Sequence, residues 1–221
     1  MERNDFLKIA AFSFVAHKLR RYNFSNLELG SAGWEQSGLL NRRHIYELNK
    51  FMGKVSDGSK TLKGVYSPDN FAFPVVPQPE GKPEYISGKA NTVTLFRRVE
   101  GTGNHGVLAH NTIAGKDFYK LDLNDLAVAV RGDKKPFFYR MFDIRQFETI
   151  SQKKGKYFDL RSKKELSASD IVDDIYLGKS YASEYRLTLQ TCLEKNSNKN
   201  WGLSFFIGRH ISPELFRHRY A

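Results

Sequence analysis

The chain has 221 residues, of which 35 are Lys or Arg and 24 are Asp or Glu, so its formal net charge is +11. The 40% share of hydrophobic residues, with 17 Phe and 11 Tyr, can close a substantial core, and this excludes a wholly disordered chain. No run approaches the roughly 18 apolar residues of a membrane span, and the charge excess predicts an anionic partner.

Two helices are predicted before residue 52. Over residues 5–22 the apolar positions recur near the helical period, and basic side chains lie on one side and at the end. A second amphipathic pattern covers residues 39–51, with Arg42 and Arg43 in its polar stripe. The stretch 53–89 then holds five prolines and several glycines among polar residues, so we expect an extended loop there.

Short runs rich in β-branched and aromatic residues follow, each bounded by Gly, Asn or Asp. The predicted strands cover 92–99, 106–113, 118–123, 126–131 and 137–142. The turn at 132–136 carries Lys134 and Lys135 at its tip. Because the runs follow one another closely, we expect an antiparallel meander.

The last third of the chain predicts a short helix, a hairpin and a terminal helix. Ser167 and Asp170 have the spacing of a helix cap. Residues 185–193 and 201–207 form the two arms of the hairpin, and Ser212 followed by proline indicates a helix start. The predicted fold class is therefore α+β: a predominantly antiparallel curved β-sheet with an N-terminal helix pair and a short C-terminal helix, in one domain over 1–221.

Neither a metal site nor a cofactor is predicted. His105 and His110 lie five residues apart on one predicted strand, so their rings point to opposite faces and cannot share an ion. The single cysteine, Cys192, lies in an alternating run and is interpreted as a small core residue. It cannot form an internal disulfide, which favours a reducing, cytoplasmic compartment.

Three residues are candidates for catalysis. His210 lies beside Arg209 at the end of a predicted strand, just before the terminal helix, where a phosphate could bind; a basic tail that merely ends the fold is the alternative. Lys63 and Tyr66, three residues apart in the predicted loop and close to Lys60, could serve as nucleophile, proton donor or phosphate ligand. Solvated loop charge is the alternative for this pair.

The charge distribution favours DNA or RNA as the partner. The residues expected to contact the nucleic-acid backbone are Arg42, Arg43, Lys134, Lys135, Lys153, Lys154, Arg209 and Arg217. An enzyme acting on nucleic acid, such as a restriction-type nuclease or a base-removing glycosylase, predicts that the three catalytic candidates converge in one pocket. A non-catalytic holding subunit of a phage or defence nucleoprotein complex predicts a dispersed basic surface and an apolar patch for other protein subunits. An anionic membrane or acidic protein remains a third class of partner.

Overall fold

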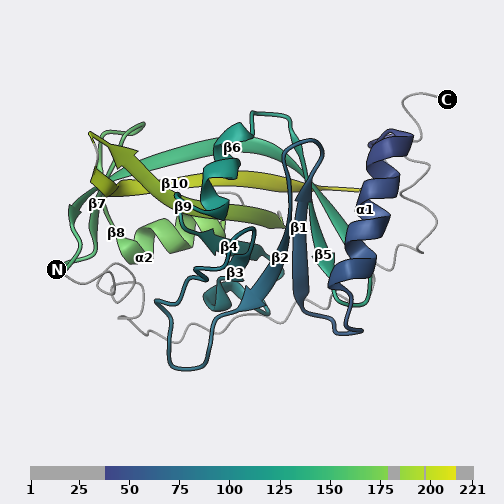
Figure 1. Cartoon of the computed structure of the whole chain (residues 1–221). Coiled ribbons are helices and arrows are strands. Elements are labelled where there is room, and N and C mark those ends of the chain that lie inside the picture. The colour runs from purple at the N-terminus through teal and green to yellow at the C-terminus, as the bar shows by residue number, and fades with distance from the viewer. Residues whose placement is uncertain (1–37, 179–184, 197, 213–221) are drawn as a thin grey trace.

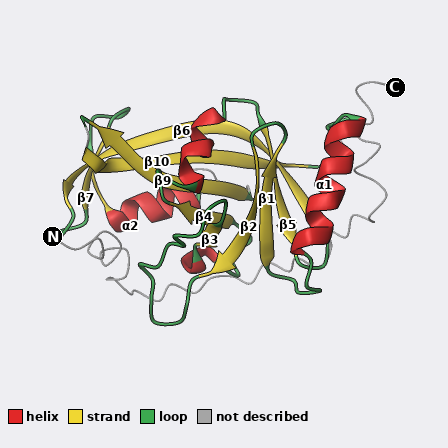
Figure 2. Ribbon diagram, in the orientation of Figure 1, coloured by secondary structure: helices red, strands yellow, loops and turns green. Residues whose placement is uncertain are grey.

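The computed structural model describes residues 38–178, 185–196 and 198–212. Its strands, in chain order, are β1 (Leu62–Ser67), β2 (Phe71–Pro77), β3 (Val93–Leu95), β4 (His105–Ala109), β5 (Leu126–Arg131), β6 (Pro136–Ser151), β7 (Lys156–Asp159), β8 (Glu165–Ser167), β9 (Arg186–Lys195) and β10 (Asn198–Ile211). Its helices are α1 (Arg42–Val55), η4 (Arg97–Val99), η5 (Ala114–Lys120), α2 (Ala168–Ile171) and η6 (Val172–Tyr176). Figure 2 shows that strands make up most of the structure and that helices lie around them.

The strands close into a barrel. The sheet order is β10-β9-β4-β3-β2-β1-β5-β6-β7-β8, and a further pairing of β10 with β6 joins the sheet to itself. Within the described residues, the closed circuit is therefore the eight strands β1-β5-β6-β10-β9-β4-β3-β2. The pairs β2–β3 and β4–β9 are parallel and the other pairs of the circuit are antiparallel, so the barrel is mixed. The long strands β6 and β10 run side by side across the molecule (Figure 1).

Alternation along each strand separates an inner core from two outer ones. Val65 of β1, Val107 of β4 and Leu189 of β9 belong to the inner cluster, to which every strand of the barrel contributes. On the outer face, Leu108 and Phe205 pack with α2 and η6 in a second cluster. A third cluster lies between α1 and the outer face of β1 and β5. The outer face of the barrel wall is thus covered at two places, by α1 and by α2 with η6.

Helix α1 is positioned by its cap and by a glycine. The side chain of Asn41 accepts a hydrogen bond from the backbone N–H of His44 at 2.9 Å, which satisfies one donor of the first turn. On the facing strand β1, a Cβ at Gly64 would lie only 2.7 Å from the ring of Phe51. A larger residue there would push the helix off the barrel.

The predicted fold class is wrong. A predominantly antiparallel curved sheet was expected, but the sheet closes through β6 and β10 and contains two parallel pairings. The meander is wrong for the same reason, since β4 pairs with β3 on one side and with the distant β9 on the other. Local alternation specifies that a segment is a strand, but it does not specify which strand will be its neighbour.

Two segments were assigned wrongly. The expected loop over 53–89 contains the hairpin of β1 and β2, because Phe71, Phe73 and Val75 belong to the inner core although Pro74 lies among them. The first half of the expected strand over 118–123 lies instead in η5, whose Phe118 is completely buried, and the second half lies in no strand. Hydrophobic burial outweighed the turn signals in the first segment and the strand signals in the second.

Other predictions hold. The second predicted helix exists as α1, shifted toward the C-terminus, and β5 has the predicted bounds. The capping box of Ser167 and Asp170 is confirmed. The helix predicted over 5–22 and the one after Ser212 lie outside the described residues. No helix in the described ranges combines the length and the apolar character needed to cross a membrane.

Candidate functional site

The three predicted catalytic residues have separate surroundings. Lys63 Nζ lies 2.8 Å from Asp57 Oδ2 in an ion pair. The Tyr66 hydroxyl is buried beneath α1 and donates to Glu47 Oε2 at 3.3 Å, and burial raises the pKa of this tyrosine. His210 packs edge-on against Tyr139, with ring centroids 5.6 Å apart. The contacts of the described residues therefore do not bring Lys63, Tyr66 and His210 together.

The predicted basic contacts lie on different elements. Arg42 and Arg43 are on α1, Lys134 and Lys135 are at the β5–β6 turn, Lys153 and Lys154 are at the β6–β7 turn, Arg209 is on β10, and Arg217 lies outside the described residues. Arg43 pairs with Asp69 at the molecular surface. The sheet that was expected to be open and curved closes into a barrel, and these cations are distributed over its helix, turns and one strand.

The two histidines considered for metal binding lie at opposite ends of β4. His105 is its first residue, and His110 follows its last, Ala109. Residues 38–178, 185–196 and 198–212 contain no group of three or more His, Cys, Asp or Glu side chains placed to hold a metal ion. At the His110 end of β4, the residues of interest are His110 itself and Cys192 on β9.

His110 and Cys192 are aligned by the parallel pairing of β4 with β9. The register pairs Val107 with Leu189 and Ala109 with Thr191. Continued by one residue, it sets His110 opposite Cys192, and opposed residues of neighbouring strands share a face. By alternation this is the outer face, which carries Leu108. The extended register therefore places an imidazole and a thiol from distant parts of the chain on one face of neighbouring segments.

Local hydrogen bonds hold the backbone on both sides of this pair. Thr191 Oγ1 donates to the carbonyl oxygen of Ala109 at 3.0 Å, which ties β9 to β4 one residue before the pair. The carbonyl of His110 accepts from the N–H groups of Ile113 at 3.0 Å and Gly115 at 2.9 Å. The chain therefore turns sharply at His110 into η5, and the position of the histidine backbone is defined.

Tyr119 connects η5 to the cysteine strand. Its hydroxyl donates to the carbonyl oxygen of Cys192 at 3.0 Å and lies 2.9 Å from Ser204 Oγ on β10. Gln146 Nε2 on β6 lies 3.5 Å from the same serine oxygen. These contacts fix the backbone of Cys192 relative to the segment that follows His110.

The thiol is buried and protonated in its resting state. Cys192 is 7% exposed, and burial raises its pKa to about 11. Leu203 of β10 is its directly opposed neighbour on the other side. Such a thiol becomes a nucleophile only when a base removes its proton as it reacts, and an imidazole, such as that of His110 just beyond the end of β4, can serve as a base.

Sequence reasoning considered both residues and did not connect them. His110 was weighed only as a partner of His105, and Cys192 only as a core residue. The signal that joins them is the parallel β4–β9 pairing, which spans a separation of 82 residues between Ala109 and Thr191. No local pattern in the sequence specifies that pairing.

No protein-family model and no curated protein matches the chain. The similar solved structures include sortase C from Clostridium perfringens SM101, with 14% identity, 80% of this chain and 95% of that chain covered, and a TM-score of 0.41. Sortase A from Listeria monocytogenes has 10% identity, coverage of 70% and 89%, and a TM-score of 0.43. The sortase D5 transpeptidase from Clostridium perfringens has 14% identity, coverage of 76% and 89%, and a TM-score of 0.44.

The prediction of a nucleic-acid-binding protein is wrong, and so is its alternative of a nucleic-acid-holding subunit. The similar solved structures are sortases, among them a transpeptidase and an enzyme with pilin substrates, rather than a nuclease, a glycosylase or a nucleoprotein subunit. DNA or RNA as the partner is overturned by the same finding. The predicted contact residues that the structure describes lie on α1, on β10 and at two separate turns.

Proposed function

We propose that this chain is a cysteine-dependent acyl transferase, in which the Cys192 thiol attacks a carbonyl carbon and His110 moves the proton. The observation that carries the proposal is the parallel register of β4 and β9, which aligns the two residues on one face of the barrel wall. A thiol with a base on the neighbouring strand is the minimum arrangement for nucleophilic catalysis by cysteine.

The order of proton transfers follows from the burial of the thiol. Because the pKa of Cys192 is raised to about 11, the resting group is S–H. In the proposal, His110 accepts that proton as the sulfur–carbon bond forms, and then gives it to the leaving amine or alcohol as the bond from the carbonyl carbon to that group breaks. The product is a thioester on Cys192. Water or an amine then attacks the thioester, its proton passes through His110 to the sulfur, and the carbon–sulfur bond breaks.

Gln190 supplies a hydrogen-bond donor in this scheme. It lies two residues before Cys192, so both side chains belong to the same face of β9. Its Oε1 accepts from the buried Tyr176 hydroxyl at 2.5 Å, which fixes the orientation of the amide. We assign its N–H groups to the substrate carbonyl oxygen, on which negative charge develops during attack.

The test uses p-nitrophenyl acetate and intact-mass spectrometry. Because Cys192 is the single cysteine of the sequence, an acetyl group bound to sulfur must be on this residue. The folded protein should gain one acetyl group at Cys192, and Cys192→Ser should gain none there. His110→Gln should slow the acetylation by about 100-fold or more, the usual contribution of a general base. His44→Gln, a histidine on α1 that pairs with Asp69, is the matched control and should react at the unaltered rate.

A second measurement adds triglycine as an amine acceptor. The sortase D5 of Clostridium perfringens is a transpeptidase, and transpeptidation transfers the acyl group to an amine. Release of acetyl-triglycine would identify aminolysis, and release of acetate alone would identify hydrolysis. Acetylation of Cys192 only after unfolding in urea, with His110→Gln indistinguishable from the original protein, would contradict the proposal and assign Cys192 to the core.

A further inference from the structure

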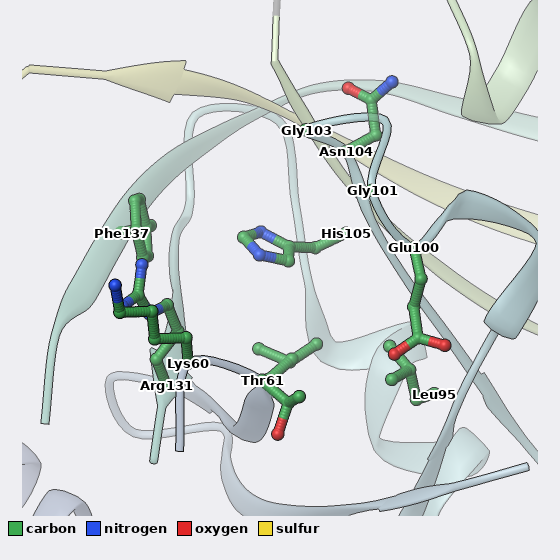
Figure 3. Close-up of a pocket in the computed structure, with 11 residues that line it drawn as sticks. Lys60, Thr61, Leu95, Glu100, Gly101, Gly103, Asn104, His105, Arg131 and Phe137 are labelled. Atoms are coloured by element: carbon green, nitrogen blue, oxygen red, sulfur yellow. The ribbon is translucent and has the colours of Figure 1, made fainter. Parts of the chain in front are cut away.

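The barrel has a cavity of about 300 Å³ at the end opposite Cys192. Its walls include residues at or near the ends of the strands, among them Leu62 of β1, Leu95 of β3, His105 of β4 and Phe137 of β6 (Figure 3). The volume is at the lower limit of small-molecule sites, and the mouth of a barrel is a common place for one. This end of the barrel is separate from Cys192, so binding of a ligand here is independent of the proposed acyl transfer.

His105 presents a defined donor to this cavity. Its Nδ1 lies 2.7 Å from the hydroxyl oxygen of Tyr139. Tyr139 is 1% exposed and burial raises its pKa, so the phenol keeps its hydrogen. Among the described residues, Nδ1 of His105 is the acceptor for that hydrogen, since the alternative would leave a buried O–H without one. Nδ1 therefore carries no proton of its own.

The ring of His105 is neutral near pH 7. Burial lowers its pKa to about 4, and the nearby His210 and Arg131 act in the same direction. A neutral imidazole without a proton on Nδ1 must carry it on Nε2. Figure 3 shows the ring projecting between Phe137 and Glu100. The cavity thus contains an N–H donor, the Nε2–H of His105, because the hydrogen bond from Tyr139 to Nδ1 fixes the tautomer of the imidazole.

Charges of opposite sign lie on the two sides of this ring. Lys60 and Arg131 lie beside Phe137, and Glu100 lies across the cavity from them (Figure 3). Arg131 is already engaged by Asp133 and stacks over Phe137, with its guanidinium carbon 5.8 Å from the ring centroid. In the described structure Lys60 and Glu100 are exposed and make no ion pair. They are available to a ligand.

We propose that this cavity binds a small zwitterion of the amino-acid or dipeptide class. Its carboxylate is held by Lys60 and by the Nε2–H of His105, and its ammonium group is held by Glu100. A site that forms charge-assisted hydrogen bonds to both a carboxylate and an ammonium group selects against molecules that carry only one of these charges. Leu62, Leu95 and Phe137 form the apolar part of the wall, which favours an apolar side chain on the ligand.

The test is calorimetric titration of the full chain with L-leucine, and with L-leucinamide and N-acetyl-L-leucine, which lack the carboxylate and the ammonium group respectively. L-leucine should bind, and the affinity for each analogue should be lower by about tenfold or more. Glu100→Gln and Lys60→Gln should each lower the affinity for L-leucine by about the same factor. Both residues are exposed, so the variants should keep the fold, which circular dichroism verifies.

Matched controls are Lys116→Gln and Glu80→Gln, exposed residues that do not line the cavity. Both control variants should bind L-leucine with the affinity of the original protein. Absence of L-leucine binding up to about 10 mM, or equal affinities for all three ligands, would overturn the proposal. Tight binding of N-acetyl-L-leucine with no effect of Glu100→Gln would also overturn it, because the site would then recognise a carboxylate alone.

Discussion

Gly115→Ala tests whether η5 is packed against the cysteine strand as described. A Cβ at this position would overlap Thr191 Oγ1 and would lie 2.8 Å from the carbonyl oxygen of His110. Ordinary contacts of a Cβ begin near 3.4 Å. The added methyl group must therefore displace β9, the turn at His110, or both.

The cost can be worked from those two contacts. Thr191 is 1% exposed, and its hydroxyl donates to the carbonyl of Ala109 at 3.0 Å. Rotating the hydroxyl away leaves buried polar groups unpaired, which costs about 1–3 kcal/mol. The His110 carbonyl cannot rotate, because it accepts two backbone N–H groups, so the backbone itself must shift. Overpacking of this kind costs about 1–3 kcal/mol, and the expected loss in the free energy of unfolding is about 2–6 kcal/mol in all.

Urea unfolding followed by intrinsic fluorescence measures this loss. Gly53→Ala is the control, because a Cβ there meets nothing within 4 Å and the residue lies inside α1. That variant should gain about 0.5–1 kcal/mol through helix propensity, opposite in sign to Gly115→Ala. Combining Gly115→Ala with Thr191→Ala removes the closer contact and should make the two changes less than additive. Equal urea midpoints for Gly115→Ala and the original protein would refute the packing argument.

Three further changes test other parts of the structure. Asn41→Ala removes the cap of α1 and should cost about 1 kcal/mol in urea unfolding, whereas Asn41→Ser should retain most of it; equal losses would argue against capping. Phe118→Ala empties a fully buried site and should cost about 3–5 kcal/mol, and a loss below about 1 kcal/mol would show that η5 does not close the barrel. Because the folded-state pKa of His105 is lowered to about 4 from 6.5, the unfolded chain binds a proton that the folded chain does not, so stability should fall as the pH is lowered through that window. His105→Gln should reduce this dependence without abolishing it, since burial lowers the pKa of His210 as well, and an unchanged pH profile would contradict the assignment.

Elements with a strong local signal were predictable from the sequence. The amphipathic pattern found α1, and alternation found β5 and the β9–β10 hairpin. The spacing of Ser167 and Asp170 was enough to find a capping box. In each case the interactions that define the element join residues close in sequence, so the pattern and the structure share one physical cause.

The closed barrel and the site could not be predicted in this way. Pairing of β6 with β10 closes the sheet, and pairing of β4 with β9 aligns His110 with Cys192, but both join segments far apart in the chain. Alternation in Thr188–Cys192 is satisfied equally by a parallel or an antiparallel neighbour. The positive net charge was misleading. Cations distributed over separate turns, one helix and one strand give the same net charge as cations gathered on one face.

The two ends of β4 differ in a way that separates the two proposed sites. Beyond its C-terminal end, η5 brings Phe118 against Phe71 and Phe206, with ring centroids 5.6 Å and 6.3 Å apart, and this aromatic cluster fills the interior. Chemistry at that end is therefore confined to the outer face, where alternation directs His110. At the N-terminal end the rings of Phe137 and Tyr139 pack against His105, with centroids 5.6 Å and 6.0 Å from it, but a cavity remains, and His105, of opposite parity, lines it. The odd separation of the two histidines, which excludes a shared metal ion, is the same property that gives each end of the strand its own surface.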